Sequence, residues 1–351
     1  MYVRRLPSSV SSPLPAKLTS LDLGPDDTFT DAEINGVLTA LAGLPLLSQL
    51  CLDHIAFAAQ QTAVQLSLLA ACPSLTDLEL QAWNAAGPSL TPSLLDQIRS
   101  SFGHLDRLSV GLMETDDLAR LLRPPSTARW RDIGYVRADE RTGELLLRLP
   151  FLTKLDLLYG LATAHVDFLS QPQLLTSLQL DCYKPGDDEA DGVQQAWFIP
   201  AGAVAASLVM CTGLTQLDLD CLNSAQWTAL FAKLTKLKKF ELLRGGTMET
   251  LQCFAAGPTT ESLEELIIRN LELPPPEVSH LYALRRLHAL ELECCFSTRL
   301  DDATIALLSP PSALLPALTK FTHTWRIADR EWDYVERQGP SFEWTQQRLA
   351  Q

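Results

Sequence analysis

A six-residue pattern that recurs along the chain is the strongest constraint on its fold. The segment Leu214–Leu219 reads Leu-Thr-Gln-Leu-Asp-Leu, with apolar residues at the first, fourth and sixth positions and polar residues at the others. Near-copies occupy Leu18–Leu23, Leu75–Leu80, Leu152–Leu157 and Leu175–Leu180. Because side chains alternate between the two faces of a strand, the hexamer predicts a short strand that buries its fourth and sixth residues.

The spacing of the hexamers indicates repeated structural units. Clear copies begin at residues 18, 47, 75, 105, 152, 175, 214, 237, 263 and 287, and degenerate copies begin at Trp130 and Leu318. Consecutive starts lie 22 to 31 residues apart, except for one gap of 39. Apolar residues at helical spacing follow the first hexamer, at Ile34, Leu38 and Leu41. Such self-similarity is typical of a solenoid, in which each unit packs on its neighbours.

The chain therefore resembles the leucine-rich repeat proteins, and its longer units resemble the ribonuclease-inhibitor type, in which each repeat is a strand followed by a helix. The resemblance implies an α/β fold: a right-handed leucine-rich repeat solenoid (horseshoe) with parallel strands on the concave face, helices on the convex face and about 12 repeats. Element spacing leads to the same curvature, because strands lie about 4.8 Å apart whereas packed helices need about 8 to 10 Å.

Domain boundaries follow from where the pattern begins, is interrupted and ends. Residues 1–17 precede the first hexamer and are expected to form an N-terminal lead-in or partial cap. Residues 18–323 form the predicted repeat domain, with an insertion loop at 183–200 that accounts for the gap of 39 residues. Residues 324–351 contain three Trp residues and are expected to cap the last repeat, whose apolar face would otherwise be exposed.

The ninth position of the repeat departs from the family pattern. The family usually has Asn or Cys there, and that side chain bonds the backbone of neighbouring turns. In this chain the ninth position holds Ile55, Trp83, Tyr183 and Leu222. The bends after the strands are therefore expected to be irregular.

The third, fifth and seventh positions are expected to face away from the core and to line the concave face. In the ten clear repeats these thirty positions hold twelve acids and four bases. One interpretation is an electronegative trough that binds a basic or mixed-charge protein surface. The alternative is that an acidic protein has an acidic face for solubility. The acids proposed to bind a partner are Asp22, Asp53, Asp77, Glu79, Asp156, Asp181, Asp218, Asp220, Glu241, Glu291 and Glu293.

Two other stretches carry a choice between a structural and a functional interpretation. Trp197 and Phe198 end the predicted insertion, where they either fold back on the solenoid or project as a loop contact with a partner. An arginine-rich stretch is either a salt-bridged surface or a site for an anion or acidic peptide. Its members are Arg120, Arg123, Arg129, Arg131, Arg137 and Arg141.

Composition limits the partners and the compartment. A formal net charge of −14 argues against nucleic acid or an anionic membrane as the main partner. No apolar run approaches the roughly 18 residues of a membrane span, and no secretory signal is evident. Eight cysteines without C-x-x-C spacing fit reduced thiols, so we expect an intracellular protein, cytoplasmic or nuclear, and a monomer. Cys182 and Cys221, at equivalent positions, are interpreted as packed thiols, with a disulfide or shared metal as the alternative.

No catalytic, nucleotide-binding or metal-binding motif occurs, so no cofactor, metal ion or enzymatic activity is expected. The resemblance instead implies a non-catalytic scaffold that binds another protein. A more specific version is a substrate-recognition subunit of a ubiquitin ligase. Since no convincing F-box is evident before Leu18, that version needs a further upstream segment or a separate adaptor. The alternative is a regulator of a small GTPase, similar to a Ran-type GTPase-activating protein.

Overall fold

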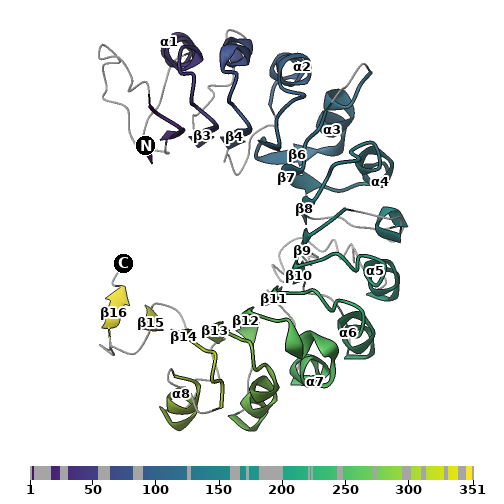
Figure 1. Cartoon of the computed structure of the whole chain (residues 1–351), viewed down its shortest axis with the longest axis vertical. Coiled ribbons are helices and arrows are strands. Elements are labelled where there is room, and N and C mark those ends of the chain that lie inside the picture. Colours follow the sequence, from purple (N-terminus) through teal and green to yellow (C-terminus); the bar gives the residue numbers. More distant parts are fainter. Residues whose placement is uncertain are drawn as a thin grey trace, which may run out of the picture. The chain divides into compact units, whose positions relative to one another are not determined.

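The computed structural model forms two compact units, Met1–Gly160 (the N-terminal unit) and Leu161–Gln351 (the C-terminal unit). In each unit the helices lie on one side of the strands (Figure 1). The residues that the structure describes are 2–3, 17–23, 31–53, 64–81, 90–124, 128–158, 167–170, 174–181, 201–219, 222, 224–242, 248–271, 275–294, 302–309, 314–327, 331–338 and 345–349.

The strands of the N-terminal unit pair in parallel, in the order β1-β2-β3-β4-β5-β7-β8, and β6 also pairs with β7. They are β1 (Tyr2–Val3), β2 (Ser20–Leu23), β3 (Gln49–Asp53), β4 (Asp77–Gln81), β5 (Arg107–Ser109), β6 (Leu112–Glu114), β7 (Asp132–Arg137) and β8 (Lys154–Leu158). The helical segments between them are α1 (Asp31–Ala42), the 3₁₀ helix η2 (Leu66–Ala71), α2 (Pro92–Ser101), α3 (Thr115–Leu121) and α4 (Thr142–Leu146).

The C-terminal unit also consists of parallel strands connected by helical segments, and it ends in strands that pair antiparallel. Its parallel strands are β9 (Ser177–Asp181), β10 (Gln216–Leu219), β11 (Lys239–Leu242), β12 (Glu265–Leu271), β13 (Ala289–Cys294) and β14 (Lys320–Ile327). Its helical segments are η4 (Asp167–Ser170), α5 (Ala201–Leu208), α6 (Ser224–Phe231), α7 (Met248–Ala256), η5 (Pro258–Glu261), η6 (Pro275–Ala283) and α8 (Asp302–Leu308). β15 (Glu331–Gln338) and β16 (Thr345–Leu349) then pair antiparallel.

The twelve predicted hexamers correspond one to one with strands. Each of β2, β3, β4, β5 and β7 to β14 begins at the third hexamer position, and neighbouring strands pair position with position, as Leu21 does with Leu50 and Leu50 with Leu78. The leucine-rich repeat solenoid fold is thereby confirmed. The ribonuclease-inhibitor class stays a prediction, because several of the described helical segments are short 3₁₀ turns.

The C-terminal boundary differs in detail from the expectation. The last parallel strand runs on through Trp325 to Ile327, and the antiparallel pair β15–β16 follows it. The positions of the Trp side chains expected to cover the last repeat lie outside the described residues, as does the predicted insertion at 183–200. The capping role of residues 324–351 therefore stays a prediction.

The core of each repeat consists of the apolar hexamer positions and of helix residues that face them. In the first repeat, Leu18 and Leu21 are buried together with Ile34, Leu38 and Leu41, each at most 2% exposed. Successive repeats bury their leucines against one another, so the apolar interior continues from turn to turn within each unit.

Aromatic residues fill part of the core of the C-terminal unit. The Trp227 and Phe231 rings of α6 stack with centroids 5.2 Å apart. The Phe240 ring from β11 meets both edge-on, at 5.4 Å from Trp227 and 5.5 Å from Phe231. This geometry is a favourable one for aromatic pairs, and it fixes the helix against the strand that follows it.

The second hexamer position joins the repeats through its backbone carbonyl. The Thr19 carbonyl accepts hydrogen bonds from the N–H groups of Ser48 and Gln49 in the next repeat, at 2.9 and 3.1 Å. In five steps the next repeat has Ser or Thr at position two, and its hydroxyl donates to the same carbonyl. These bonds form a hydroxyl ladder of 3.0 to 3.3 Å: Ser48 to Thr19, Thr76 to Ser48, Thr153 to Arg131, Thr215 to Thr176 and Thr319 to His288.

Buried side chains make a second set of bonds between repeats, on the helical side. The donors and acceptors are Cys72 Sγ to the Leu41 carbonyl (3.2 Å), Cys211 Sγ to the Leu169 carbonyl (3.5 Å) and Thr259 Oγ1 to the Phe231 carbonyl (2.8 Å). Burial raises the pKa of the Cys211 thiol to about 11 and also raises that of Cys72. Both thiols therefore stay protonated near neutral pH, as donation requires.

We predict that Thr259→Val and Thr319→Val, although chemically identical, differ in their effect on stability. Thr259 is fully buried, so loss of its hydrogen bond to Phe231 is expected to lower the free energy of unfolding by about 1–3 kcal/mol. Thr319 is exposed, so water replaces its bond and the loss should stay below about 1 kcal/mol. Urea denaturation measures the free energy of unfolding of both variants. Equal losses would show that the burial of a hydrogen bond does not change its contribution to stability.

Candidate protein-binding surface

The third and fifth hexamer positions face away from the helices, and we call this side of each sheet the open face. It is the side on which the sequence predicted the partner-binding acids. Asp22, Asp77, Glu79, Glu241 and Glu291 lie there and are partly exposed.

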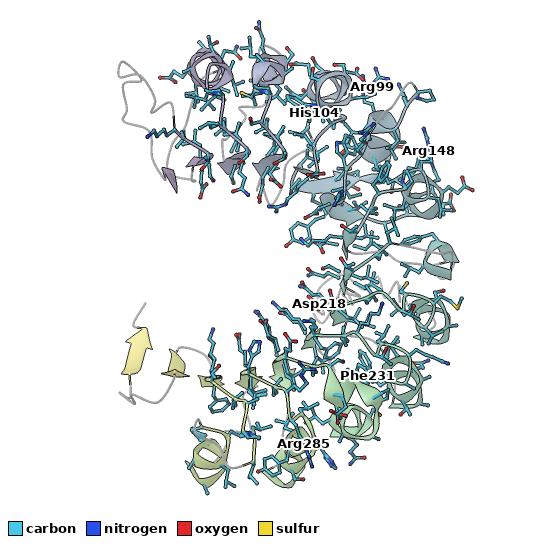
Figure 2. The ribbon with its side chains drawn as sticks, viewed as in Figure 1. Arg99, His104, Arg148, Asp218, Phe231 and Arg285 are labelled. Carbon is cyan, nitrogen blue, oxygen red and sulfur yellow. The ribbon has the colours of Figure 1, made fainter. Side chains whose placement is uncertain are left out.

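Two of the predicted acids are more covered than the sequence indicated. Asp156 and Asp218 are only 4% and 6% exposed, although both lie on the open face. Figure 2 labels Asp218 on the strand side of its repeat, opposite the helices. The expectation of free exposure was wrong for these two, because a short side chain in a parallel sheet has neighbours about 4.8 Å away on either side.

Register places the fifth-position residues of the C-terminal unit in a single row. In the C-terminal unit, Asp218 pairs with Glu241, Glu241 with Ile267, and Ile267 with Glu291. The row is completed by Gln179 at one end and Thr322 at the other. The three acids proposed from the sequence therefore lie in one line, which a different fold would have scattered.

The third-position row of the N-terminal unit alternates in charge. Asp77 pairs with Arg107, Arg107 with Asp132, and Asp132 with Lys154. Opposite charges directly across neighbouring strands attract one another, whereas like charges repel. The alternating charges of this row therefore stabilise the sheet. The fifth-position row of the C-terminal unit, in which Asp218 lies opposite Glu241, does not have this advantage.

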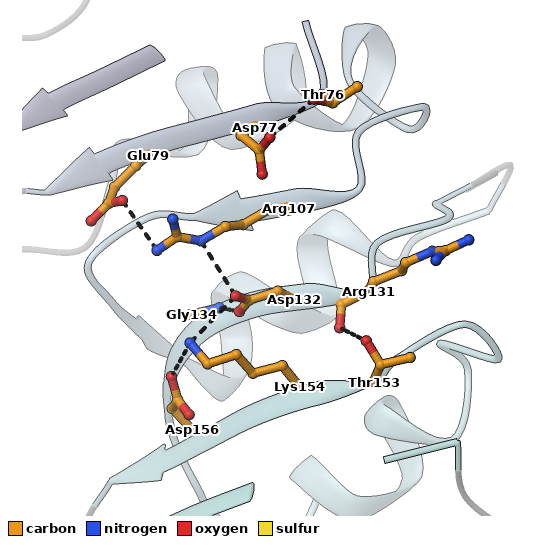
Figure 3. Close-up of polar contacts among 10 residues, drawn as sticks. All are labelled: Thr76, Asp77, Glu79, Arg107, Arg131, Asp132, Gly134, Thr153, Lys154 and Asp156. Carbon is orange, nitrogen blue, oxygen red and sulfur yellow. Dashed lines mark hydrogen bonds and ion pairs between the residues drawn. The ribbon is translucent and has the colours of Figure 1, made fainter. Parts of the chain in front are cut away.

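Ion pairs connect five side chains of this face into one network (Figure 3). Arg107 lies 3.1 Å from Glu79 and 3.3 Å from Asp132. Lys154 lies 3.4 Å from Asp132 and 3.1 Å from Asp156. The network contains three acids and two bases, so it has one excess negative charge, while each long basic side chain is held in place by two carboxylates.

Burial and neighbouring charges shift the pKa values of Asp156 and Lys154 in opposite directions. Burial raises the pKa of Asp156, and the Lys154 ammonium opposes the rise without cancelling it. For Lys154, burial alone would lower the pKa, but the Asp156 and Asp132 carboxylates together outweigh it, so the pKa is raised. Burial, and then the Asp156 charge, raise the pKa of the neighbouring Tyr135.

A bulge beside the network was not predicted from the sequence. Gly134 has φ +66°, its N–H donates to Asp132 Oδ1 at 2.9 Å, and the register with β8 shifts between Asp132 and Tyr135. The shift brings Tyr135 opposite Asp156. In the preceding repeat, Gly111 has φ 72° and separates β5 from β6. Such bulges re-aim side chains, and here the result is an aromatic residue beside the charged network.

Among the described residues, the open face of the C-terminal unit has two ion pairs. Arg269 lies 3.0 Å from Glu241, and Lys239 lies 3.8 Å from Glu265. The remaining predicted site residues are not described. The side chains of Asp53, Asp181 and Glu293 lie outside the described residues, as do Asp220, Trp197 and Phe198 entirely.

The arginine-rich stretch is a salt-bridged surface where the structure describes its pairs. Four of its arginines contact acids of the neighbouring repeat: Arg120 with Asp96, Arg131 with Asp106 at 3.5 Å, Arg137 with Glu114 at 2.9 Å, and Arg141 with Asp116 at 2.8 Å. The hydrogen bond from Arg120 lowers the pKa of Asp96. The structural interpretation of this stretch is confirmed for these four residues.

Metal sites, disulfides and membrane-spanning helices are the other features considered for the described residues. No group of three or more His, Cys, Asp or Glu residues there is arranged to hold a metal ion. Cys51, Cys72, Cys211 and Cys253 are not in disulfides. None of the helices in the described part of the chain has both the length and the apolar character of a membrane span.

Comparison with known proteins gives a distant match among solved structures. No family model and no curated protein matches this sequence. Among solved structures, an internalin from Listeria monocytogenes is similar over 92% of this chain and 92% of its own, with 14% sequence identity and a TM-score of 0.39. The leucine-rich repeat assignment of this chain rests on its own hexamers and strand register.

We predict that Gly134→Ala is destabilising and that Gly36→Ala is not. An added Cβ at Gly134 would lie 2.5 Å from Ser109 Oγ at a positive φ, so the bulge must distort, at a cost of about 1–3 kcal/mol. At Gly36, within α1, nothing lies within 4 Å, and alanine should stabilise the helix by about 0.5–1 kcal/mol. Urea denaturation of both variants tests this, and equal midpoints would exclude a strained bulge.

We also predict a pH dependence that comes from Asp156. Its pKa in the folded protein lies above the ordinary value of 3.8, so the folded state keeps this proton to higher pH than the unfolded state does. Its contribution to stability is fully present below the ordinary pKa and is lost as pH rises through the folded pKa. The stability of wild type relative to Asp156→Asn should therefore fall as pH rises from below the ordinary pKa of 3.8 through the raised pKa of the folded state. A constant difference over that range would contradict the prediction.

Proposed function

We propose that this protein is a non-catalytic binding scaffold, and that its open face recognises a basic or mixed-charge surface on another protein. The observation that carries the proposal is the aligned row of Asp218, Glu241 and Glu291 in the C-terminal unit. Asp218 and Glu241 are directly opposite one another, and like charges so placed lower stability. A ligand that neutralises the row would recover that cost.

The ion pairs of the open face support the same function. Glu241 is held by Arg269, and Lys154 is held by two carboxylates. Side chains that are already ordered lose less conformational entropy when a partner binds. Tyr135, which the bulge places beside the charged network, belongs to a residue type that often contributes much of the binding energy in protein interfaces.

The narrower functions implied by the family resemblance stay predictions. A ubiquitin-ligase substrate receptor would bind its substrate on this face, and a regulator of a small GTPase would need groups that complete the GTPase site. A nucleotide-hydrolysis assay with small GTPases separates the second from the first. Likewise, an intracellular location and a monomeric state remain expectations from the sequence.

Charge reversal on the open face tests the proposal. The test variant combines Glu241→Lys and Glu291→Lys with Asp218→Asn, since a lysine at the nearly covered position 218 would endanger folding. A partner isolated with the wild-type chain should bind this variant at least about tenfold more weakly, because attraction becomes repulsion. Titration calorimetry measures the affinity, and circular dichroism verifies that the variant is folded.

The matched control reverses two exposed acids away from the open face, with Glu140→Lys and Glu144→Lys. Its affinity should equal that of the wild type. If the open-face variant also bound as well as the wild type, the acidic row would serve only solubility and the proposal would fail.

A further inference from the structure

Exposed apolar side chains gather in the turns that lead from a helix into the next strand. Among the described residues, the large apolar side chains that are more than a third exposed are Leu46, Leu147, Phe151, Leu174, Met210 and Leu307. All but Leu307 lie in such turns. We call the row of these turns in the C-terminal unit, residues 174–176, 210–215, 233–238, 257–264 and 284–288, its strand-entry edge.

One end of the strand-entry edge is apolar. Leu174 and Met210 are 61% and 59% exposed, and they belong to consecutive repeats, since the Thr215 N–H donates to the Thr176 carbonyl at 2.8 Å. Gly213, in the same turn as Met210, approaches the preceding repeat closely, since a Cβ added there would lie 3.3 Å from the Leu175 carbonyl.

The next repeats make the edge basic. Five exposed cations lie in the turns before β11 and β13: Lys233, Lys236, Lys238, Arg285 and Arg286. Figure 2 labels Arg285. The acids between them are Glu261 and Glu264, and Glu264 is already engaged by Lys238 at 3.1 Å and lies 4.0 Å from His288. Five cations against two acids give this edge a positive charge in a chain of net charge −14.

We propose that the strand-entry edge of the C-terminal unit binds an extended acidic segment of a partner protein that has an apolar residue at one end. Leu174, Lys236 and Arg286 occupy the same place, directly before the hexamer, in alternate repeats. Alternate strands lie about 10 Å apart, which an extended peptide covers in about three residues. The segment thus has its apolar residue and its two acids about three residues apart from one another.

This surface is separate from the open face in both position and charge. The open face presents acids at the fifth hexamer position, whereas the strand-entry edge presents bases before the hexamer and at its second position. The proposal therefore does not depend on the function proposed for the open face. A nucleic acid would use the cations alone, whereas an acidic protein segment uses the apolar end as well.

Fluorescence anisotropy with labelled peptides tests the proposal on the full chain. The probe is a seven-residue peptide with Leu at its first position and Glu at the fourth and seventh, separated by Ser. Matched probes replace every Glu by Lys, replace Leu by Ser, or consist of single-stranded oligothymidine of seven residues. We expect the Leu–Glu peptide to bind more tightly than all three and to weaken as salt rises, because the contacts are exposed ion pairs.

Two variants locate the binding site. Lys236→Glu with Arg286→Glu should weaken the Leu–Glu peptide at least about tenfold, since two attractions become repulsions. Lys17→Glu with Arg123→Glu changes the net charge equally at exposed positions of the N-terminal unit and should leave the affinity unchanged. Leu174→Ser with Met210→Ser should remove the preference for the peptide that carries Leu.

Several results would overturn the proposal: equal binding by the edge variant and the wild type, tighter binding of the Lys peptide, or tighter binding of oligothymidine. Because the open-face variant leaves Lys236 and Arg286 in place, it should bind the Leu–Glu peptide as the wild type does. A loss there, with the edge variant unaffected, would assign peptide binding to the open face instead.

Discussion

The rest of the structure depends on the hydrogen bonds that the second-position carbonyl of one repeat accepts from the next. Two backbone N–H groups reach this carbonyl in ten described steps, as Ser48 and Gln49 reach Thr19, and in five of those steps a hydroxyl joins them. These bonds lie at the start of the parallel strands and hold neighbouring strands in register. A slip of one residue would turn each leucine towards solvent and each charge towards the core, so the register is strongly determined.

Once the register is fixed, each hexamer position stacks on the same position of the next repeat, except after the bulge in β7, and the chemistry of a row depends on which residues occupy it. In the N-terminal unit the third-position row alternates in sign and forms a continuous network through Arg107 and Lys154. In the C-terminal unit the fifth-position row puts Asp218 opposite Glu241, and the nearest described compensation comes from Arg269 on the next strand. Stabilising and destabilising surfaces are therefore built on the same backbone.

Much of this arrangement could be read from the sequence, because strand alternation and repeat spacing depend on local patterns alone. All twelve hexamers became strands that begin at the third position. The bulge at Gly134 was not predicted, since glycine has many roles and only its positive φ reveals this one. The burial of Asp156 depends on side chains of other repeats, and the residue pattern of a single hexamer holds no information about them. The hydroxyl ladder did have a sequence signal, the repeated Ser or Thr at position two, as at Thr76 and Thr215.

The C-terminal unit presents two surfaces of opposite charge, and the length of the hexamer keeps them apart. Lys238 occupies the second position and Glu241 the fifth, so their backbone positions are about 10 Å apart along a strand. That distance is comparable to the screening length of about 8 Å at physiological ionic strength, so salt weakens the attraction between the cations of the edge and the acids of the open face. On the two proposals above, a short ligand binds one surface or the other, whereas a folded partner wide enough to cover both would be basic where it meets the strands and acidic where it meets the turns.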